Sequence, residues 1–288
     1  MRNISLETIT AAVQGSMKDA PDARFHEVIS SLVTHLHAFA SEVHLTHAEW
    51  NAGIDFLWRA GRISDDKRNE FVLISDVLGL SSLVDLLNGS PHGTESSVLG
   101  PFYVEGAPLL PVGASIVGDN SGERVLMHGR VFDSAGQPLA GALLDFWQTD
   151  ADGLYSQATP HRPEFNLRCR MRTDAQGRYA LQTVKPRCYA VPYDGPVGDL
   201  LRAGARHAWR PSHFHVLVTA PGQRRLVTEL FADDDPYIGA DAVFGVRSTL
   251  VLHFERHDDA AAAVPYKIEA PFFEVKFDFH LDAERPAA

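Results

Sequence analysis

The sequence predicts a mainly β protein in which an N-terminal α-helical domain precedes a C-terminal β-sandwich domain. Three observations lead to this fold class: apolar residues at helical spacing before residue 90, apolar residues alternating with polar ones after residue 93, and no long helical pattern between the later segments. A chain of 288 residues has room for about two domains. We therefore expect a helical domain over residues 1–95 and a β-sandwich over residues 96–288.

The helical pattern is clearest in residues 25–43, where apolar residues recur at the i, i+3, i+4 spacing of one helix face. These apolar residues are Phe25, Val28, Ile29, Leu32, Val33, Leu36, Phe39, Ala40 and Val43. Residues 48–58 and 66–87 continue the helical pattern, and Gly79 is expected to break the last segment. The first region thus predicts three or more amphipathic helices.

The strand pattern is clearest near the end of the chain, where aromatic residues and valine alternate with charged residues over 273–280. This period of two places apolar side chains on one sheet face and polar ones on the other. Similar short runs occur at residues 125–132, 142–148, 179–184, 213–219, 226–231 and 249–254. Several short strands without long intervening helices favour a β-sandwich or barrel.

Composition excludes several classes of function. The net charge of −11 argues against a broad basic face for nucleic acid or anionic lipid. Two cysteines, Cys169 and Cys188, are too few for a disulfide framework or a four-cysteine metal site. The sequence contains no signal-peptide core, no 18-residue apolar run and no glycine-rich nucleotide motif. We expect a cytoplasmic protein without a nucleotide cofactor, and any metal must be bound by ligands other than cysteine.

A candidate metal site begins with His213 and His215. On an alternating strand these residues point to the same face, roughly 7 Å apart along the strand, which suits two imidazoles that bind one ion. An isolated His-x-His is also typical of two hydrogen-bonded histidines on a polar face. His35 and His37 form the same motif on an expected helix, where positions i and i+2 lie on different faces. We do not expect a site at that pair.

Two tyrosines extend the candidate site. Tyr155 follows a turn-like Asp-Ala-Asp-Gly segment, and Tyr189 lies in a segment rich in proline and glycine. Taken alone, each tyrosine is typical of a packing anchor with a hydrogen-bonded hydroxyl. Together with two histidines they form a different kind of donor set, because phenolate is a hard anionic ligand that favours a trivalent ion.

At these residues the sequence resembles the intradiol ring-cleaving dioxygenases. The matching stretches are Gly153-Leu154-Tyr155-Ser156, Asn166-Leu167-Arg168, Tyr189 with Pro192, and Arg210-Pro211-Ser212-His213-Phe214-His215. Four further stretches, residues 78–81, 94–102, 194–198 and 243–246, are most similar to the hydroxyquinol 1,2-dioxygenase branch of the family. The resemblance implies cleavage of a small aromatic diol or triol with O2 in the degradation of aromatic compounds, and it implies Fe(III) as the cofactor.

The resemblance also implies the roles of individual residues. It makes Tyr155, Tyr189, His213 and His215 the iron ligands, with Tyr189 the ligand that leaves and takes a proton when the substrate binds. Arg210 corresponds to the family's arginine, a permanent cation that stabilises negative charge on the substrate. The implied substrate pocket consists of Leu73, Asp76, Val98, Leu99, Gly100, Pro101, Phe102, Val191, Pro192 and Arg210. By the same resemblance, the N-terminal helices form a homodimer interface that can hold a lipid.

Three alternatives remain open at this point. Catechol or a chlorocatechol is the nearest alternative substrate. A non-enzymatic β-sandwich that binds a ligand through its histidines and tyrosines would bind no iron. A cupin-type site, built from His-x-His and a carboxylate, would need Glu229, but this residue lies 14 positions after His215, farther than that motif's usual spacing. Relatives of the catechol branch tend to carry an amide at the position of Glu229, so we assign this residue no role.

Overall fold

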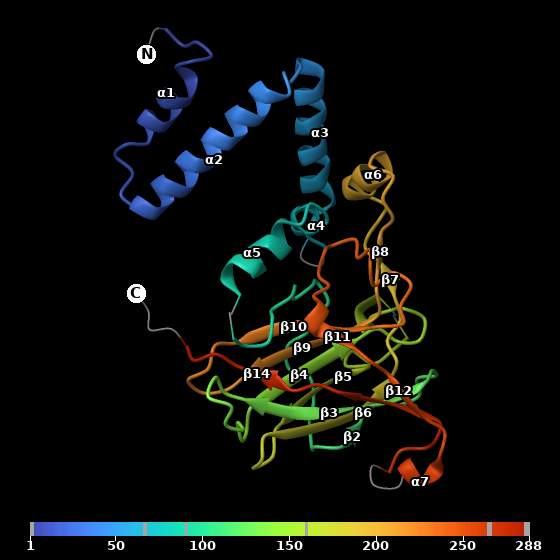
Figure 1. Cartoon of the computed structure of the whole chain (residues 1–288). Coiled ribbons are helices and arrows are strands. Elements are labelled where there is room, and N and C mark those ends of the chain that lie inside the picture. The colour runs from blue at the N-terminus through green and yellow to red at the C-terminus, as the bar shows by residue number, and fades with distance from the viewer. Residues whose placement is uncertain (1–2, 66–67, 90–91, 159–160, 264–266, 285–288) are drawn as a thin grey trace. The chain divides into compact units, whose positions relative to one another are not determined.

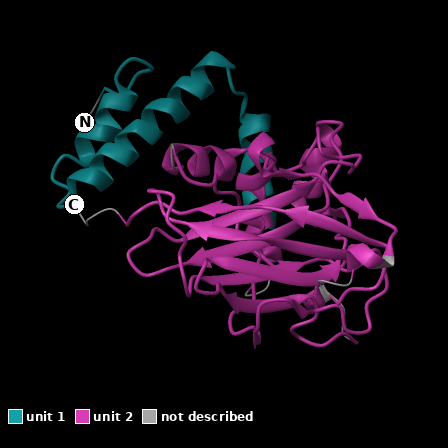
Figure 2. Cartoon of the chain, turned by 60° about the horizontal axis from the view of Figure 1, so that its bottom comes forward, with its two compact units in different colours: residues 1–59 teal, residues 60–288 magenta. Residues whose placement is uncertain are grey.

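The structure is a computed structural model that describes residues 3–65, 68–89, 92–158, 161–263 and 267–284. Its contacts divide the chain into two compact units, residues 1–59 and residues 60–288 (Figure 2). The expected domain boundary near residue 95 does not coincide with this division, because the helices of residues 70–88 are grouped with the sheets. The expected domains, 1–95 and 96–288, therefore stay a prediction.

The first unit contains helices α1 (Ile9–Ser16), α2 (Ala23–Glu42) and most of α3 (His47–Ile63). Helix α2 begins after Asp22, whose carboxylate accepts hydrogen bonds from the backbone N–H groups of Arg24 and Phe25. No residue of α2 is buried, and the apolar side chains that share its predicted face are about half exposed. The predicted helix is confirmed, and its apolar face remains accessible in the described structure.

Helices α4 (Glu70–Val77) and α5 (Leu80–Asn88) belong to the second unit, and the left-handed Gly79 separates them as predicted. Helix α4 packs against α6 (Pro196–Ala203) through Leu73 and Val77. The fully buried carboxylate of Glu70 accepts the Val197 backbone N–H at 3.0 Å and so caps α6. These contacts hold α4 and α6 together beside the candidate site.

Two sheets form the rest of the second unit, as the sequence predicts (Figure 1). The first has the order β1 (Leu109–Leu110), β5 (Arg168–Arg172), β4 (Leu143–Gln148), β9 (His213–Thr219), β10 (Leu226–Ala232), β11 (Val251–Leu252). The second has the order β12 (Glu255–His257), β13 (Phe272–Lys276), β3 (Arg124–Phe132), β6 (Arg178–Val184), β2 (Ala114–Ser115), with β14 (Phe279–His280) also paired to β3. Shorter elements are the β7 (Tyr189–Ala190) and β8 (Trp209–Arg210) pair, helix α7 (Ala260–Ala263), and two 3₁₀ turns, Ser156–Ala158 and Ser248–Leu250.

The hydrophobic core lies between the two sheets, and strand β9 shows how it positions the site. Phe214, Val216 and Val218 point into the core together with residues of β3, β6 and β13. Because side chains alternate along a strand, His213 and His215 point to the opposite face of the first sheet. Both histidines are nevertheless buried, since loops cover that face.

Candidate metal centre

Four side chains that the sequence singled out meet on the covered face of the first sheet. The Nε2 atoms of His213 and His215 lie 3.1 Å apart, and the Tyr155 hydroxyl oxygen lies 2.9 Å from the His215 Nε2 and 3.4 Å from the His213 Nε2. The Tyr189 ring packs edge-on to Tyr155, with 5.3 Å between ring centroids. Each of the four residues is at most 9% exposed. The structure thus brings two phenols and two imidazoles into one enclosed cluster.

Local structure explains why the two tyrosines meet. The Asp150 carboxylate accepts the backbone N–H groups of Asp152 and Leu154, which closes the turn before Tyr155. Gly153 has a φ of +78°, and a Cβ there would lie 2.7 Å from the carbonyl oxygen of Cys188, the residue before Tyr189. Only glycine allows the two segments to approach so closely.

The two imidazole rings are held in fixed orientations. The His213 Nδ1–H donates to the carbonyl oxygen of Pro211 at 2.7 Å, which leaves its Nε2 as the nitrogen with a lone pair. The His215 ring stacks on Trp147, with centroids 4.7 Å apart and planes 4° from parallel. Gly100 has a φ of +70°, and a Cβ there would meet the His215 ring at 3.3 Å. Both Nε2 atoms therefore face the same small space.

Burial sets the protonation states in this space. Burial, and then the charge of Arg210, lowers the pKa of His213, while burial together with His213 and Arg210 lowers the pKa of His215 well below its usual range. Burial also raises the pKa of Tyr155 and of Tyr189. The imidazoles are thus neutral and can donate lone pairs, whereas the phenols stay protonated unless a cation compensates for the charge of phenolate.

This donor set fits a trivalent iron ion. Two phenolates offer hard anionic oxygens and two neutral imidazoles offer nitrogens, a combination suited to Fe(III). Two neutral imidazole nitrogens only 3.1 Å apart also repel each other unless a proton or a cation lies between them. The four residues are therefore able to hold the metal that the sequence comparison implied.

A charged network lies against the cluster. The Arg210 guanidinium binds the Glu229 carboxylate in a bidentate pair at 2.6 and 2.9 Å and contacts Asp241 at 3.1 and 3.2 Å. The Ser97 hydroxyl donates to Glu229 at 2.7 Å. Burial alone would raise the pKa of Glu229, but the charge of Arg210 and the hydrogen bonds to the carboxylate together outweigh it, so the pKa is lowered and the carboxylate is ionised. Arg210 is held in place from two sides.

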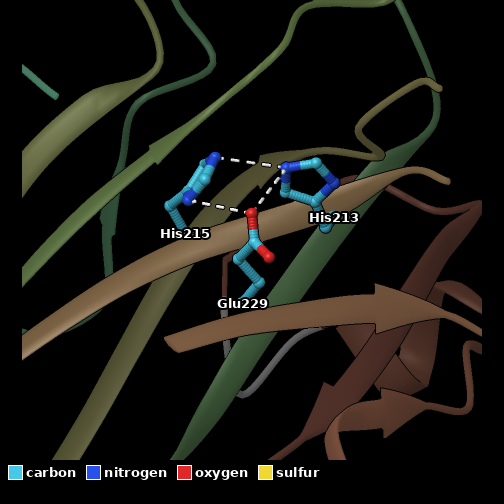
Figure 3. A group of neighbouring side chains, drawn as sticks. All are labelled: His213, His215 and Glu229. Carbon is cyan, nitrogen blue, oxygen red and sulfur yellow. Dashed lines mark hydrogen bonds and ion pairs between the residues drawn. The ribbon is translucent and has the colours of Figure 1, made fainter. Parts of the chain in front are cut away.

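Glu229 is a residue that the sequence analysis considered but assigned no role. Its Oε1 lies 3.5 Å from the His213 Nε2 and 3.5 Å from the His215 Nδ1 (Figure 3). The register of β10 on β9 places Glu229 directly opposite His215. Distance along the chain argued against this contact, but a hairpin brings residues far apart in sequence onto one face. The alternation of residues 226–231 is the signal that could have found it.

The expected pocket residues divide into two groups. Leu73 and Val191 are buried in one cluster with Val98 packed against them, and Asp76 on the same helix as Leu73 is 9% exposed. Phe102 stacks on Tyr155, with 4.3 Å between ring centroids. The structure brings Gly100 to the His215 ring and Arg210 opposite Tyr189 in the β7–β8 pair. By contrast, Leu99 and Pro101 are exposed and Pro192 is half-buried.

Two protein families match the chain. The family described as "Catechol dioxygenase N terminus" matches residues 22–94, and the family described as "Dioxygenase" matches residues 98–283. Together these matches cover most of the sequence.

Curated relatives and solved structures agree with these matches. The chain is 43% identical to a 6-chlorohydroxyquinol 1,2-dioxygenase of Cupriavidus pinatubonensis, over 94% of this chain and 98% of the relative. It is 45% identical to a hydroxyquinol 1,2-dioxygenase of Rhizobium sp. (90% and 88%) and 39% identical to a catechol 1,2-dioxygenase of Candida albicans (96% and 93%). The crystal structure of a hydroxyquinol 1,2-dioxygenase from Pseudomonas putida superposes with a TM-score of 0.90 at 44% identity, covering 97% of this chain and 99% of the other.

Proposed function

The chain belongs to the intradiol ring-cleaving dioxygenases, and we propose that it cleaves hydroxyquinol, benzene-1,2,4-triol, between its adjacent hydroxyls. The product would be 3-hydroxy-cis,cis-muconate, whose keto form is maleylacetate. Both atoms of O2 would be incorporated into this product. The observation that carries the reaction type is the buried convergence of two tyrosines and two histidines. As a member of this family the chain is an enzyme, so the hypothesis of a non-enzymatic binding module is wrong.

We propose Tyr155, Tyr189, His213 and His215 as the ligands of Fe(III). When bound, the ion supplies a Lewis acid that withdraws electron density from the aromatic diol and so activates it toward O2. The cupin-type alternative loses support for two reasons. Glu229 already binds Arg210 and Ser97, and the side chains of two tyrosines lie directly beside the histidines.

The remaining steps belong to the protein's own side chains. As a phenolate, Tyr189 would accept one hydroxyl proton of the entering diol at its oxygen and become a phenol, and burial, which raises the pKa of Tyr189, would keep the proton there. Arg210, fixed by Glu229 and Asp241, places a permanent cation beside Tyr189, where it stabilises negative charge on the substrate. The stacked Phe102 and the cluster of Leu73, Val98 and Val191 exclude water from a flat ring.

The triol is favoured over catechol by one side chain. Asp76 projects from α4, the helix that also contributes Leu73 to the apolar cluster, and is largely buried. Its carboxylate can accept a hydrogen bond from the hydroxyl that hydroxyquinol has and catechol lacks. The similarity to a catechol 1,2-dioxygenase of Candida albicans keeps catechol or a chlorocatechol as the second candidate substrate.

We also propose a cytoplasmic homodimer. Among the described helices none is long and apolar enough to cross a membrane. Helix α2 leaves Phe25, Leu32, Leu36 and Phe39 about half exposed, and a contiguous apolar face of this kind is typical of an interface. A second copy of the chain is the proposed occupant, with a lipid between the apolar faces. Light scattering tests the dimer, and native mass spectrometry tests the lipid.

The visible spectrum of the iron-loaded protein, measured together with O2 uptake, tests the proposed function. Phenolate bound to Fe(III) absorbs visible light, so we expect a red protein that consumes about one O2 per hydroxyquinol. Tyr155→Phe should remove most of the colour and weaken iron retention. Tyr179→Phe is the matched control, because its buried phenol donates to the Phe277 carbonyl oxygen, outside the cluster. A colourless but active iron protein, or a Tyr155→Phe variant that keeps the full colour, would show that the ligands are chosen wrongly.

A further inference from the structure

A second group of metal-binding side chains lies on the outer face of the second sheet. Glu255 and His257 come from β12, Glu274 from β13 and His128 from β3. Glu255 is directly opposite Glu274 in the antiparallel β12–β13 pair, and His128 is opposite the residue two positions after Glu274. Because side chains alternate, all four residues lie on the face away from the sandwich core. They belong to a different sheet from Tyr155 and the histidines of β9.

The donor atoms of these residues converge. The His128 Nε2 lies 2.7 Å from one oxygen of Glu274, and the His257 Nε2 lies 3.0 Å from the other. One ligand atom each of Glu255, His257 and Glu274 fall within 4.8 Å of one another. Two ligands of a tetrahedral Zn²⁺ are roughly 3.4 Å apart, given metal–ligand bonds of about 2.1 Å. Glu255, His257 and Glu274 therefore place donor atoms close enough together to bind one divalent ion, and His128 lies on the other side of the Glu274 carboxylate.

Two features favour the binding of a cation by this group. Glu255 and Glu274 are like charges directly opposite each other across two strands, an arrangement that destabilises a sheet. The His257 Nε2 is shielded from solvent and, within the described parts of the chain, forms no hydrogen bond of acceptable geometry, although a carboxylate oxygen is 3.0 Å away. Two cationic residues share this face. The Arg124 guanidinium donates to the carbonyl oxygen of Asn120, and Lys276, which lies opposite His128, is exposed.

We propose that Glu255, His257 and Glu274 form a second metal site that binds Zn²⁺ or a similar borderline divalent cation, while His128 contacts the oxygen of Glu274 that His257 does not. Imidazole nitrogen and carboxylate oxygens are ligands of this class of ion, and two carboxylates balance its charge. The bound ion would connect β12 and β13 and reduce the repulsion between the two glutamates. Its role is structural, because the ion binds outside the catalytic cluster.

Calorimetric titration of the iron-loaded enzyme with Zn²⁺ tests this site. Iron occupies the catalytic cluster, so we expect one additional saturable site in the wild-type protein. In Glu274→Gln and in His257→Gln, the Zn²⁺ affinity of this site should be lower than in the wild type by about tenfold or more. His253→Gln is the matched control, because His253 also pairs with a carboxylate, Asp233, at 2.7 Å but is highly exposed. This variant should bind Zn²⁺ as the wild type does.

Thermal unfolding supplies a second readout. At a Zn²⁺ concentration about a hundredfold above the dissociation constant, the Tm of the wild type should rise by roughly 5 °C, and that of Glu274→Gln should not. Dioxygenase activity should be the same in all variants. Absence of saturable binding in the wild type would overturn the proposal. Unchanged Zn²⁺ affinity in both cluster variants would also overturn it, by showing that the ion binds to other surface histidines.

Discussion

Replacement of Asp76 by alanine tests how the enzyme recognises its substrate. Asp76 is 9% exposed, and burial raises its pKa, while a hydrogen bond from Ser81 and the charge of Arg210 act in the opposite direction. A buried carboxylate of this kind needs hydrogen-bond donors. In the proposed function, the third hydroxyl of hydroxyquinol would provide one, whereas catechol has no hydroxyl at that position.

The size of the effect follows from these contacts. A buried acceptor left without its partner costs about 1–3 kcal/mol. Since Ser81 and the charge of Arg210 already lower the pKa of Asp76 against the effect of burial, we expect the lower part of this range, about 1–2 kcal/mol. That free energy corresponds to a roughly five- to thirtyfold preference for hydroxyquinol over catechol in kcat/KM.

The assay is O2 uptake with both substrates on matched iron-loaded proteins. Asp76→Ala should lower kcat/KM for hydroxyquinol by roughly five- to thirtyfold and change the value for catechol by less than about twofold, with iron content and colour retained. Asp85→Ala, on the neighbouring helix α5, is the control, and its ratio between the substrates should match the wild type. Equal losses on both substrates, or no loss on either, would remove Asp76 from substrate recognition.

Two further substitutions test the buried charges. Burial raises the pKa of Asp145 to about 6, so this group costs stability above that pH and ceases to do so as the pH falls toward 4. Asp145→Asn, which keeps an acceptor for the Tyr103 hydroxyl, should raise the free energy of unfolding by up to about 3 kcal/mol at pH 7.5 and by little at pH 4, and a gain of equal size at both pH values would contradict this reasoning. Glu229→Gln leaves Arg210 paired with Asp241 alone and should lower the free energy of unfolding by about 3 kcal/mol in denaturant titrations, whereas an unchanged value would mean that the pair contributes nothing.

The fold and half of the metal cluster follow from sequence periodicity. The period of two in residues 213–219 places His213 and His215 on one face, and β9 confirms this while Phe214 points into the core. Tyr155 and Tyr189 could not be placed in the same way. Each lies next to a turn or an irregular segment, and they meet only because Gly153 packs against the chain before Tyr189. Their roles came from the family resemblance.

The sequence pattern could not predict which distant segments contact each other. Helical spacing predicted the helices of residues 66–87 but gave no partner for them, because an apolar face shows that a helix packs and not what it packs against. In the structure, Leu73 and Val77 of α4 pack against α6, and Asp76 of the same helix is buried where the charge of Arg210 acts to lower its pKa against the effect of burial. Strand register likewise decides that Glu229 lies opposite His215.

The buried network also accounts for the charge of the proposed centre. Arg210, Glu229 and Asp241 together have one net negative charge at full ionisation, and they lie against the histidines. A ferric ion held by two phenolates from Tyr155 and Tyr189 alone would have one net positive charge. The negative charge of the network would offset it in a region where an unbalanced charge is costly. An amide in place of Glu229 would remove this negative charge, because Arg210 and Asp241 alone would sum to zero at full ionisation.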